Sequence, residues 1–165
     1  DAVIASIPTS HDVDALREDT TEVLAPVAEA CKEICARYNV SLSGKQAVVI
    51  GNGRLVGAPT ARFLRESGAH VTIVTKHTEG GFVYIRDAEI LVSGAGDPGF
   101  IMPDMIREGV VLFDAGTSED GGVLRGDADP RCGDKASLFT PVPGGIGPIT
   151  IAVLFRNLVT LWASR

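Results

Sequence analysis

The sequence predicts an α/β protein in which helices cover both faces of a mostly parallel sheet. Four short runs rich in Val and Ile predict strands, and helix-like segments separate them: AVVI (47–50), HVTIV (70–74), EILVS (89–93) and GVVLFD (109–114). Continuous apolar runs of this kind are typical of parallel strands that are buried on both faces. A fifth run, AVIASI (2–7), is a further strand candidate.

Composition narrows the class of protein. The 165-residue chain has 45% hydrophobic and 22% charged residues, which fits a soluble globular domain with or without a tail. Its net charge of −6 argues against a nucleic-acid-binding surface, and no apolar run reaches the length that we expect of a membrane span. The three cysteines and the lack of a signal-like start predict reduced thiols. We therefore expect a cytoplasmic protein, with mitochondria as the alternative, and no nucleic-acid or membrane partner.

Two further segments have helical periodicity. In APVAEACKEICARYNV (25–40), one face collects Val27, Cys31, Ile34, Cys35 and Tyr38. Cys31 and Cys35 could form a metal or redox pair, but no third ligand is near in the sequence, so we interpret them as core residues. The last segment, ITIAVLFRNLVTLWASR (149–165), is apolar on most sides. It therefore predicts a second covering surface, from a partner subunit or from another part of the same enzyme.

The join GNGRLVG (51–57) follows the first strand and opens a helix, as in a Rossmann-like, doubly wound fold. Gly51 permits a tight turn, Gly53 lets a pyrophosphate approach the backbone, and Gly57 allows close helix–strand packing. Unpaired N–H groups at a helix start favour an anion. The spacing is one residue longer than the usual dinucleotide pattern, and a purely structural turn is the alternative.

The ends of the later strands meet the same crevice. The second strand ends in VTKHT (74–78), where Lys76 stands in place of the carboxylate that usually binds the ribose hydroxyls of NAD. A cation at this position suits the 2′-phosphate of NADP, so NADP is favoured over NAD. The alternative is that Lys76 is only a solvated charge. GAGDPG (94–99) and DAGT (114–117) follow the third and fourth strands, and ordinary turns are again the alternative.

The order of these motifs resembles the bifunctional methylenetetrahydrofolate dehydrogenase/methenyltetrahydrofolate cyclohydrolase family. TPVPGGIGPITIAVL (140–154) is similar to its C-terminal signature, and GKQAVVIGNGRLVGAP (44–59) to its cofactor turn. ILVSGAGDPGFI, VVLFDAGT and HDVDAL match further family segments. The resemblance implies that residues 1–42 are a junction segment and helix from an inter-domain region. It implies that residues 43–165 form the NAD(P)-binding Rossmann-like domain with its apolar final helix.

The resemblance also implies a set of site residues. The substrate side takes Asp14, in the D-V-D stretch, and Gly144, whereas no metal site and no catalytic residue is expected within the chain. The cofactor side takes Gly51, Asn52, Gly53, Arg54, Val56, Lys76, Ala95, Gly96, Thr117 and Gly145.

The chain departs from the family at several of these positions. Asn52 and Gly53 replace the Arg and Ser of the family's G-R-S turn, so either Arg54 or Lys76 would have to hold the NADP phosphate. His11 and Ala15 replace the Lys and Gly of the family's K-D-V-D-G stretch, which weakens the expectation of folate binding.

The implied reaction transfers a hydride from 5,10-methylenetetrahydrofolate to NADP and then hydrolyses the methenyl bridge. The family's catalytic lysine belongs to a Tyr-x-x-x-Lys motif in an N-terminal folate domain, and we expect that domain to be absent here. We therefore expect little or no activity from this chain alone, and tetrahydrofolate binding only when that domain is supplied. The apolar final helix further predicts a homo-oligomer. The alternatives are a non-catalytic nucleotide-binding or assembly module and an oxidoreductase for an unrelated substrate.

Overall fold

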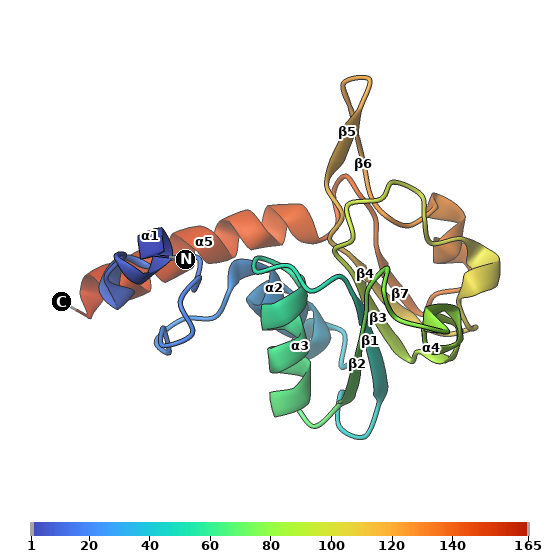
Figure 1. Ribbon diagram of the computed structural model, residues 1–165, viewed down its shortest axis with the longest axis horizontal. Helices are drawn as coiled ribbons and strands as arrows, with labels where there is room; N and C mark the ends of the chain where they lie inside the picture. The colour runs from blue at the N-terminus through green and yellow to red at the C-terminus, as the bar shows by residue number, and fades with distance from the viewer. Residues whose placement is uncertain (1, 165) are drawn as a thin grey trace.

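The computed structural model, which describes residues 2–164, has a five-stranded parallel sheet at its centre (Figure 1). The strands lie in the order β2-β1-β3-β4-β7, and all neighbouring pairs are parallel. Their bounds are Gln46–Ile50 for β1, His70–Val74 for β2, Ile90–Ser93 for β3, Val111–Asp114 for β4 and Leu138–Thr140 for β7. The first four coincide with the four apolar runs, which confirms the predicted parallel α/β fold.

Helices cover both faces of this sheet, as the sequence predicted. The helices α2 (Pro26–Arg37) and α3 (Gly57–Glu66) pack on one face, against a core that contains Val49 and Val92. The helix α4 (Gly81–Asp87) and the 3-10 turns η2 (Pro103–Met105) and η3 (Pro130–Asp134) lie on the other side. The core there contains Val48 and Leu91. Successive strand residues thus enter opposite cores, which is why each strand is apolar at nearly every position.

The start of the chain does not join the sheet, so the strand candidate at 2–7 is wrong. Ala2–Ala5 forms the short helix α1, and the 3-10 turn η1 follows at Thr9–His11. The Ser6 N–H donates to the Ala2 carbonyl, and the Ser6 hydroxyl donates to the Val3 carbonyl at 2.6 Å. These local bonds use backbone groups that a strand would offer to a neighbour. Figure 1 shows this segment beside the final helix, α5 (Ile146–Ala163), away from the sheet.

The helix α5 is largely uncovered. Of its residues, all of which the structure describes, only four are buried: Ile146, Val153, Asn157 and Leu161. Arg156 pairs with Glu29 at 2.9 Å and Glu33 at 2.7 Å on α2. By length and composition alone α5 could cross a membrane, contrary to the sequence expectation. Arg156, however, lies in the middle of α5 and forms two ion pairs with α2. A paired charge at this position favours protein rather than lipid around α5.

The three cysteines are free and buried. Cys31 and Cys35 lie on the buried face of α2, where burial raises the pKa of both thiols, that of Cys35 to about 11. Cys132 is buried in η3, with its Sγ 3.4 Å from the Ile101 carbonyl. Tyr38, which the sequence places on the same helical face as Cys31 and Cys35, is 66% exposed and follows the helix, which ends at Arg37. Within residues 2–164 no group of three or more His, Cys, Asp or Glu side chains could hold a metal ion.

A two-stranded antiparallel hairpin projects from the sheet beyond β4 (Figure 1). It consists of β5 (Ser118–Asp120) and β6 (Val123–Arg125), with Gly121 and Gly122 at positive φ in the turn. The hairpin was not predicted from the sequence, because its strands have three residues each and lack an apolar run.

Candidate functional site

A cavity of about 530 Å³ lies at the carboxyl ends of β1, β2 and β3. The strand order reverses direction at β1, with β2 on one side and β3 on the other. Open α/β sheets bind their ligands at such a reversal. Four predicted cofactor residues line this cavity: Gly51, Asn52, Lys76 and Ala95.

The glycine turn between β1 and α3 is closely packed on one side and open on the other. Gly51 has a φ of 91°, and a Cβ there would lie 2.8 Å from the Gly94 carbonyl oxygen. A Cβ at Gly57 would lie 2.8 Å from the Gly51 carbonyl carbon. Tight turning and close packing therefore explain these two glycines, as predicted. A Cβ at Gly53, by contrast, would meet no atom of the described residues within 4 Å, so packing does not require glycine there.

The open side of the turn offers hydrogen-bond donors. Within residues 2–164 neither the Asn52 nor the Gly53 backbone N–H donates a hydrogen bond. No side chain in this described part caps the start of α3, whose N-cap residue is Val56. The Val56 side chain instead packs closely on Gly94: a Cβ added at Gly94 would lie only 2.9 Å from the Val56 Cβ. Val56 therefore joins the turn to the loop after β3, while the peptide groups of 52 and 53 remain available to an anion.

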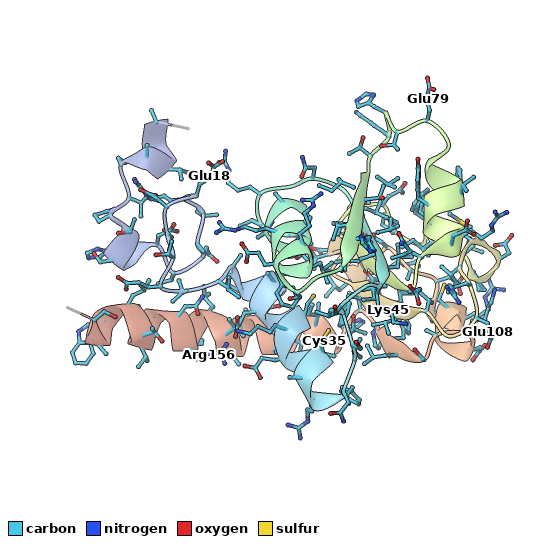
Figure 2. The ribbon with its side chains drawn as sticks, turned by 90° about the horizontal axis from the view of Figure 1, so that it is seen from below. Glu18, Cys35, Lys45, Glu79, Glu108 and Arg156 are labelled. Carbon is cyan, nitrogen blue, oxygen red and sulfur yellow. The ribbon has the colours of Figure 1, made fainter. Side chains whose placement is uncertain are left out.

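The end of β2 carries the positive charge of the cavity. Lys76 is exposed, and it lies within a turn that is closed by a hydrogen bond from the Thr75 N–H to the Thr78 hydroxyl at 3.0 Å. Glu79, the first carboxylate after β2, points away from the protein in Figure 2. Among the described residues that line the cavity, Lys76 is the one cation and Asp97, from the β3 side, is the one carboxylate.

An aromatic pair forms another wall of the cavity. The Phe82 and Phe100 rings have centroids 6.2 Å apart and are tilted by 42°. Phe100 is partly buried against the core, whereas Phe82, on α4, is 63% exposed. An exposed ring beside a cavity offers a face on which a planar base could stack.

Two buried carboxylates at this end of the sheet were not predicted as site residues. Asp114 ends β4, and its carboxylate accepts from the N–H groups of Gly116 at 2.9 Å, Asp127 at 3.1 Å and Ala128 at 2.9 Å. Burial raises the pKa of Asp114, and these three N–H groups oppose that shift. Asp127 accepts bonds from the loop after β3. Asp127 thus fixes the loop after β3, which borders the cavity, and Asp114 holds the segment that carries Asp127. The only sequence signal at either position was the DAGT turn (114–117).

The remaining cofactor candidates lie outside the cavity lining. Arg54 faces other hollows, beside Leu16, Arg17 and Glu18. Gly96 lies in the loop after β3, with a φ of 69°, and Thr117 is exposed just before the hairpin. Gly145 is the N-cap residue of α5, and its N–H donates to the Pro141 carbonyl at 2.7 Å.

The two substrate candidates lie apart. Gly144 has a φ of 99° and open space around it. Asp14 is partly buried near the start of the chain, where burial and, secondarily, the Asp12 carboxylate raise its pKa. Asp12 itself is buried and accepts from Leu16 N–H, Arg17 N–H and the Thr20 hydroxyl, which makes it a structural turn residue.

A second hollow, of about 560 Å³, lies at the opposite edge of the sheet. The Lys45–Glu89 ion pair, with atoms 2.8 Å apart, lies in it, and hydrogen bonds from Lys45 and the Gln46 N–H hold the pKa of Glu89 low. This lysine and this carboxylate are therefore already paired. The hollow also lies at the amino ends of the strands, so we place the ligand site at the carboxyl ends.

Comparison with known proteins identifies the kind of domain. Residues 25–165 match the family model for the tetrahydrofolate dehydrogenase/cyclohydrolase NAD(P)-binding domain. The chain is 38% identical to the bifunctional protein FolD of Halothermothrix orenii over 169 aligned positions, covering 96% of this chain and 60% of that protein. It is 39% identical to the Staphylococcus aureus protein of the same name, covering 81% of this chain and 46% of that protein. The chain thus spans about half to three-fifths of these relatives' lengths.

Solved structures give the same result. The Campylobacter jejuni methylenetetrahydrofolate dehydrogenase/cyclohydrolase superposes with a TM-score of 0.92 at 31% identity, covering 99% of this chain and 62% of that one. The Trypanosoma brucei enzyme, determined in complex with NADP and an inhibitor, superposes with a TM-score of 0.88 at 31% identity over the same shares.

Proposed function

Because this chain belongs to the tetrahydrofolate dehydrogenase/cyclohydrolase family, as an NAD(P)-binding domain, we propose that it binds NADP at the carboxyl edge of its sheet. We propose further that it thereby serves hydride transfer from 5,10-methylenetetrahydrofolate and hydrolysis of the methenyl product. The observation that carries the proposal is the cavity itself, in which the glycine turn offers free peptide donors and the end of β2 offers the Lys76 ammonium group.

The residues that line the cavity, together with the adjoining Gly53 of the glycine turn, fit the parts of NADP. The N–H groups of Asn52 and Gly53 suit a pyrophosphate, since they have no protein acceptor among the described residues. Lys76 suits the 2′-phosphate that distinguishes NADP from NAD, and Phe82 offers a ring face to adenine. When bound, the nicotinamide accepts the hydride, while the protein orients it and excludes water. In this proposal Gly144, Gly145 and Asp14 approach the reacting end and the folate.

A second candidate is a nucleotide-binding module without catalysis. The replacement of the family's G-R-S turn by Gly51, Asn52 and Gly53 favours it. None of Lys32, Lys45, Lys76 and Lys135 lies in a Tyr-x-x-x-Lys setting, so both candidates place any catalytic lysine outside these 165 residues. Both candidates share the NADP site and differ only in chemistry.

Two measurements test the proposal. Calorimetric titration of the chain with NADP and with NAD tests the site, and we expect binding with a preference for NADP. Absorbance of the reduced nicotinamide, followed with 5,10-methylenetetrahydrofolate as hydride donor, tests the chemistry. Failure of NADP to bind would refute the whole proposal. Binding without any hydride transfer, also when the remaining part of a FolD relative is added in trans, would favour the non-catalytic module.

We also propose that a protein surface covers α5. Five large apolar side chains of this helix are more than half exposed: Ile151, Phe155, Leu158, Val159 and Trp162. An apolar strip of this kind fits either a second copy of the chain or another part of the same enzyme. Sedimentation of the chain alone separates these, because only the first predicts a homo-oligomer. The three buried reduced thiols support a cytoplasmic or mitochondrial setting.

A further inference from the structure

The loop that borders the cavity on the β3 side is attached to one buried carboxylate. Asp127 is fully buried in the segment between β6 and η3. Its Oδ2 accepts hydrogen bonds from the Ser93 hydroxyl at 2.6 Å, the Ala95 N–H at 2.8 Å and the Gly96 N–H at 3.3 Å. Its Oδ1 accepts from the Asp97 N–H at 2.9 Å. Three successive peptide groups therefore point at a single side chain.

The Asp127 backbone is fixed in turn. Its N–H donates to Asp114 at 3.1 Å, and its carbonyl accepts from the Ile101 N–H at 2.9 Å. The neighbouring Gly126 carbonyl accepts from the Gly99 N–H at 3.0 Å. Both ends of the loop that follows β3 are thus tied to the same segment, so the position of Asp127 determines the position of the loop.

The chemistry of the four donors requires a carboxylate. An ionised carboxylate offers only acceptors, and here every partner is a donor. An asparagine of the same size would turn an NH₂ group toward at least one peptide N–H. The loop could then keep its fold only with one peptide group rotated or unpaired.

We propose that Asp127 is a positioning residue for the cofactor: it holds residues 95–97 in place before NADP binds. The inference rests on the proposed function, because Ala95 and Asp97 line the cavity assigned to NADP. A loop that is already ordered does not lose conformational entropy on binding, so it adds to affinity. Asp127 itself does not line the cavity and acts only through the loop.

The effect should depend on which part of the ligand reaches the loop. Lys76 lies at the end of β2, whereas residues 95–97 follow β3, on the other side of β1. The adenosine end of NADP is expected beside Lys76, so the rest of the dinucleotide extends over β1 toward the loop. Adenosine 2′,5′-bisphosphate, which contains only the adenosine end, should depend on Asp127 far less than NADP does.

The test is calorimetry on the 165-residue chain carrying Asp127→Asn, with NADP and adenosine 2′,5′-bisphosphate as ligands. We expect NADP affinity to fall about tenfold, the cost of one lost hydrogen bond to a charged group, and bisphosphate affinity to change less than about threefold. Ser93→Ala is the matched control, because it removes a bond from the same carboxylate but leaves the three peptide donors. It should destabilise the protein while both affinities remain as in the unchanged chain.

An equal loss for both ligands, or none for NADP, would overturn the inference. If the unchanged chain does not bind NADP, the proposed function fails instead. A second measurement needs no variant: in the ligand-free chain, the amides of Ala95 and Asp97 should exchange hydrogen more slowly than those at the hairpin tip, residues 121–122. Exchange as fast as at the tip would show that Asp127 does not hold the loop, and this result decides the inference if Asp127→Asn does not fold.

Discussion

Lys76→Ala should remove most of the preference for NADP and leave NAD binding nearly unchanged. Lys76 is the one cation among the described residues that line the cavity, and it lies at the strand end where the ribose of a dinucleotide is expected. NADP differs from NAD by a phosphate on that ribose. A change confined to the ammonium group should therefore act on one cofactor only.

The exposure of Lys76 sets the size of this effect. Two opposite unit charges about 4 Å apart attract by about 1 kcal/mol in water and about 4 kcal/mol at an intermediate dielectric constant. Solvent screening and the entropy of a long side chain keep an exposed pair near the lower value. A phosphate with nearly two negative charges raises the gain to about 1.5 kcal/mol, which is about tenfold in affinity.

Calorimetric titration with both cofactors, at low and at high salt, measures this difference. The NADP preference of the unchanged chain should shrink as salt rises, and that of Lys76→Ala should not. Lys32→Ala is the control, because Lys32 pairs with Glu29 at 3.2 Å on α2, outside the cavity lining. If Lys76→Ala retained the full preference for NADP, the assignment of this residue would be wrong, and Arg54 would become the next candidate.

Three further predictions concern the turn, the loop and acid stability. Gly51→Ala should lower the free energy of unfolding, measured by denaturant titration, by about 2 kcal/mol or more, because Gly51 has a positive φ. Gly53→Ala should fold normally, because a Cβ there would meet no atom of the described residues within 4 Å, but it should bind NADP more weakly, because the pyrophosphate is expected to approach the backbone there. Asp97→Asn should tighten NADP binding in calorimetry, because it removes the negative charge that lines the cavity. Hydrogen bonds from Arg131 lower the pKa of Asp129 to about 2. The ionised Asp129 carboxylate therefore contributes to stability above pH 3.8, and this contribution is lost as the pH falls toward 2. In Asp129→Asn the melting temperature should change less between these two pH values than in the unchanged chain.

The parallel sheet could be predicted because burial on both faces leaves a signal in the sequence. The strands β1, β3 and β4 are mostly apolar, since their successive residues enter the core under α2 and α3 on one side and the core under α4, η2 and η3 on the other. The edge strand β2, with His70 exposed and only Val74 buried, is less apolar. The strand β7 has no apolar run, because it contains only Leu138, Phe139 and Thr140. The run at 2–7 shows the converse, since apolar composition without a neighbouring strand produced a short exposed helix.

The site could be predicted only in part, for a similar reason. Glycines at a strand-to-helix join are a local signal, so Gly51 and Gly57 were interpreted from spacing alone. Arg54 follows Gly53 directly in sequence, yet it faces Leu16 and Arg17 rather than the cavity, because its direction depends on how the turn continues into α3. The role of Asp127 depends on peptide groups about 30 positions earlier in the chain. No periodicity or spacing rule in a single sequence reveals such a contact.

The hydrogen bonds of Asp127 also limit where an anion can bind. The N–H groups of residues 95–97 all donate to this carboxylate, so they are not available to a pyrophosphate. Asn52 and Gly53, on the β1 side, keep peptide N–H groups with no acceptor among the described residues. The loop after β3 can then contribute surface and shape but not phosphate binding. Substitutions in the glycine turn should therefore weaken NADP and pyrophosphate alike, whereas loosening the loop should weaken NADP and leave inorganic pyrophosphate unaffected. A loss of pyrophosphate binding in Asp127→Asn would contradict this division between the two loops.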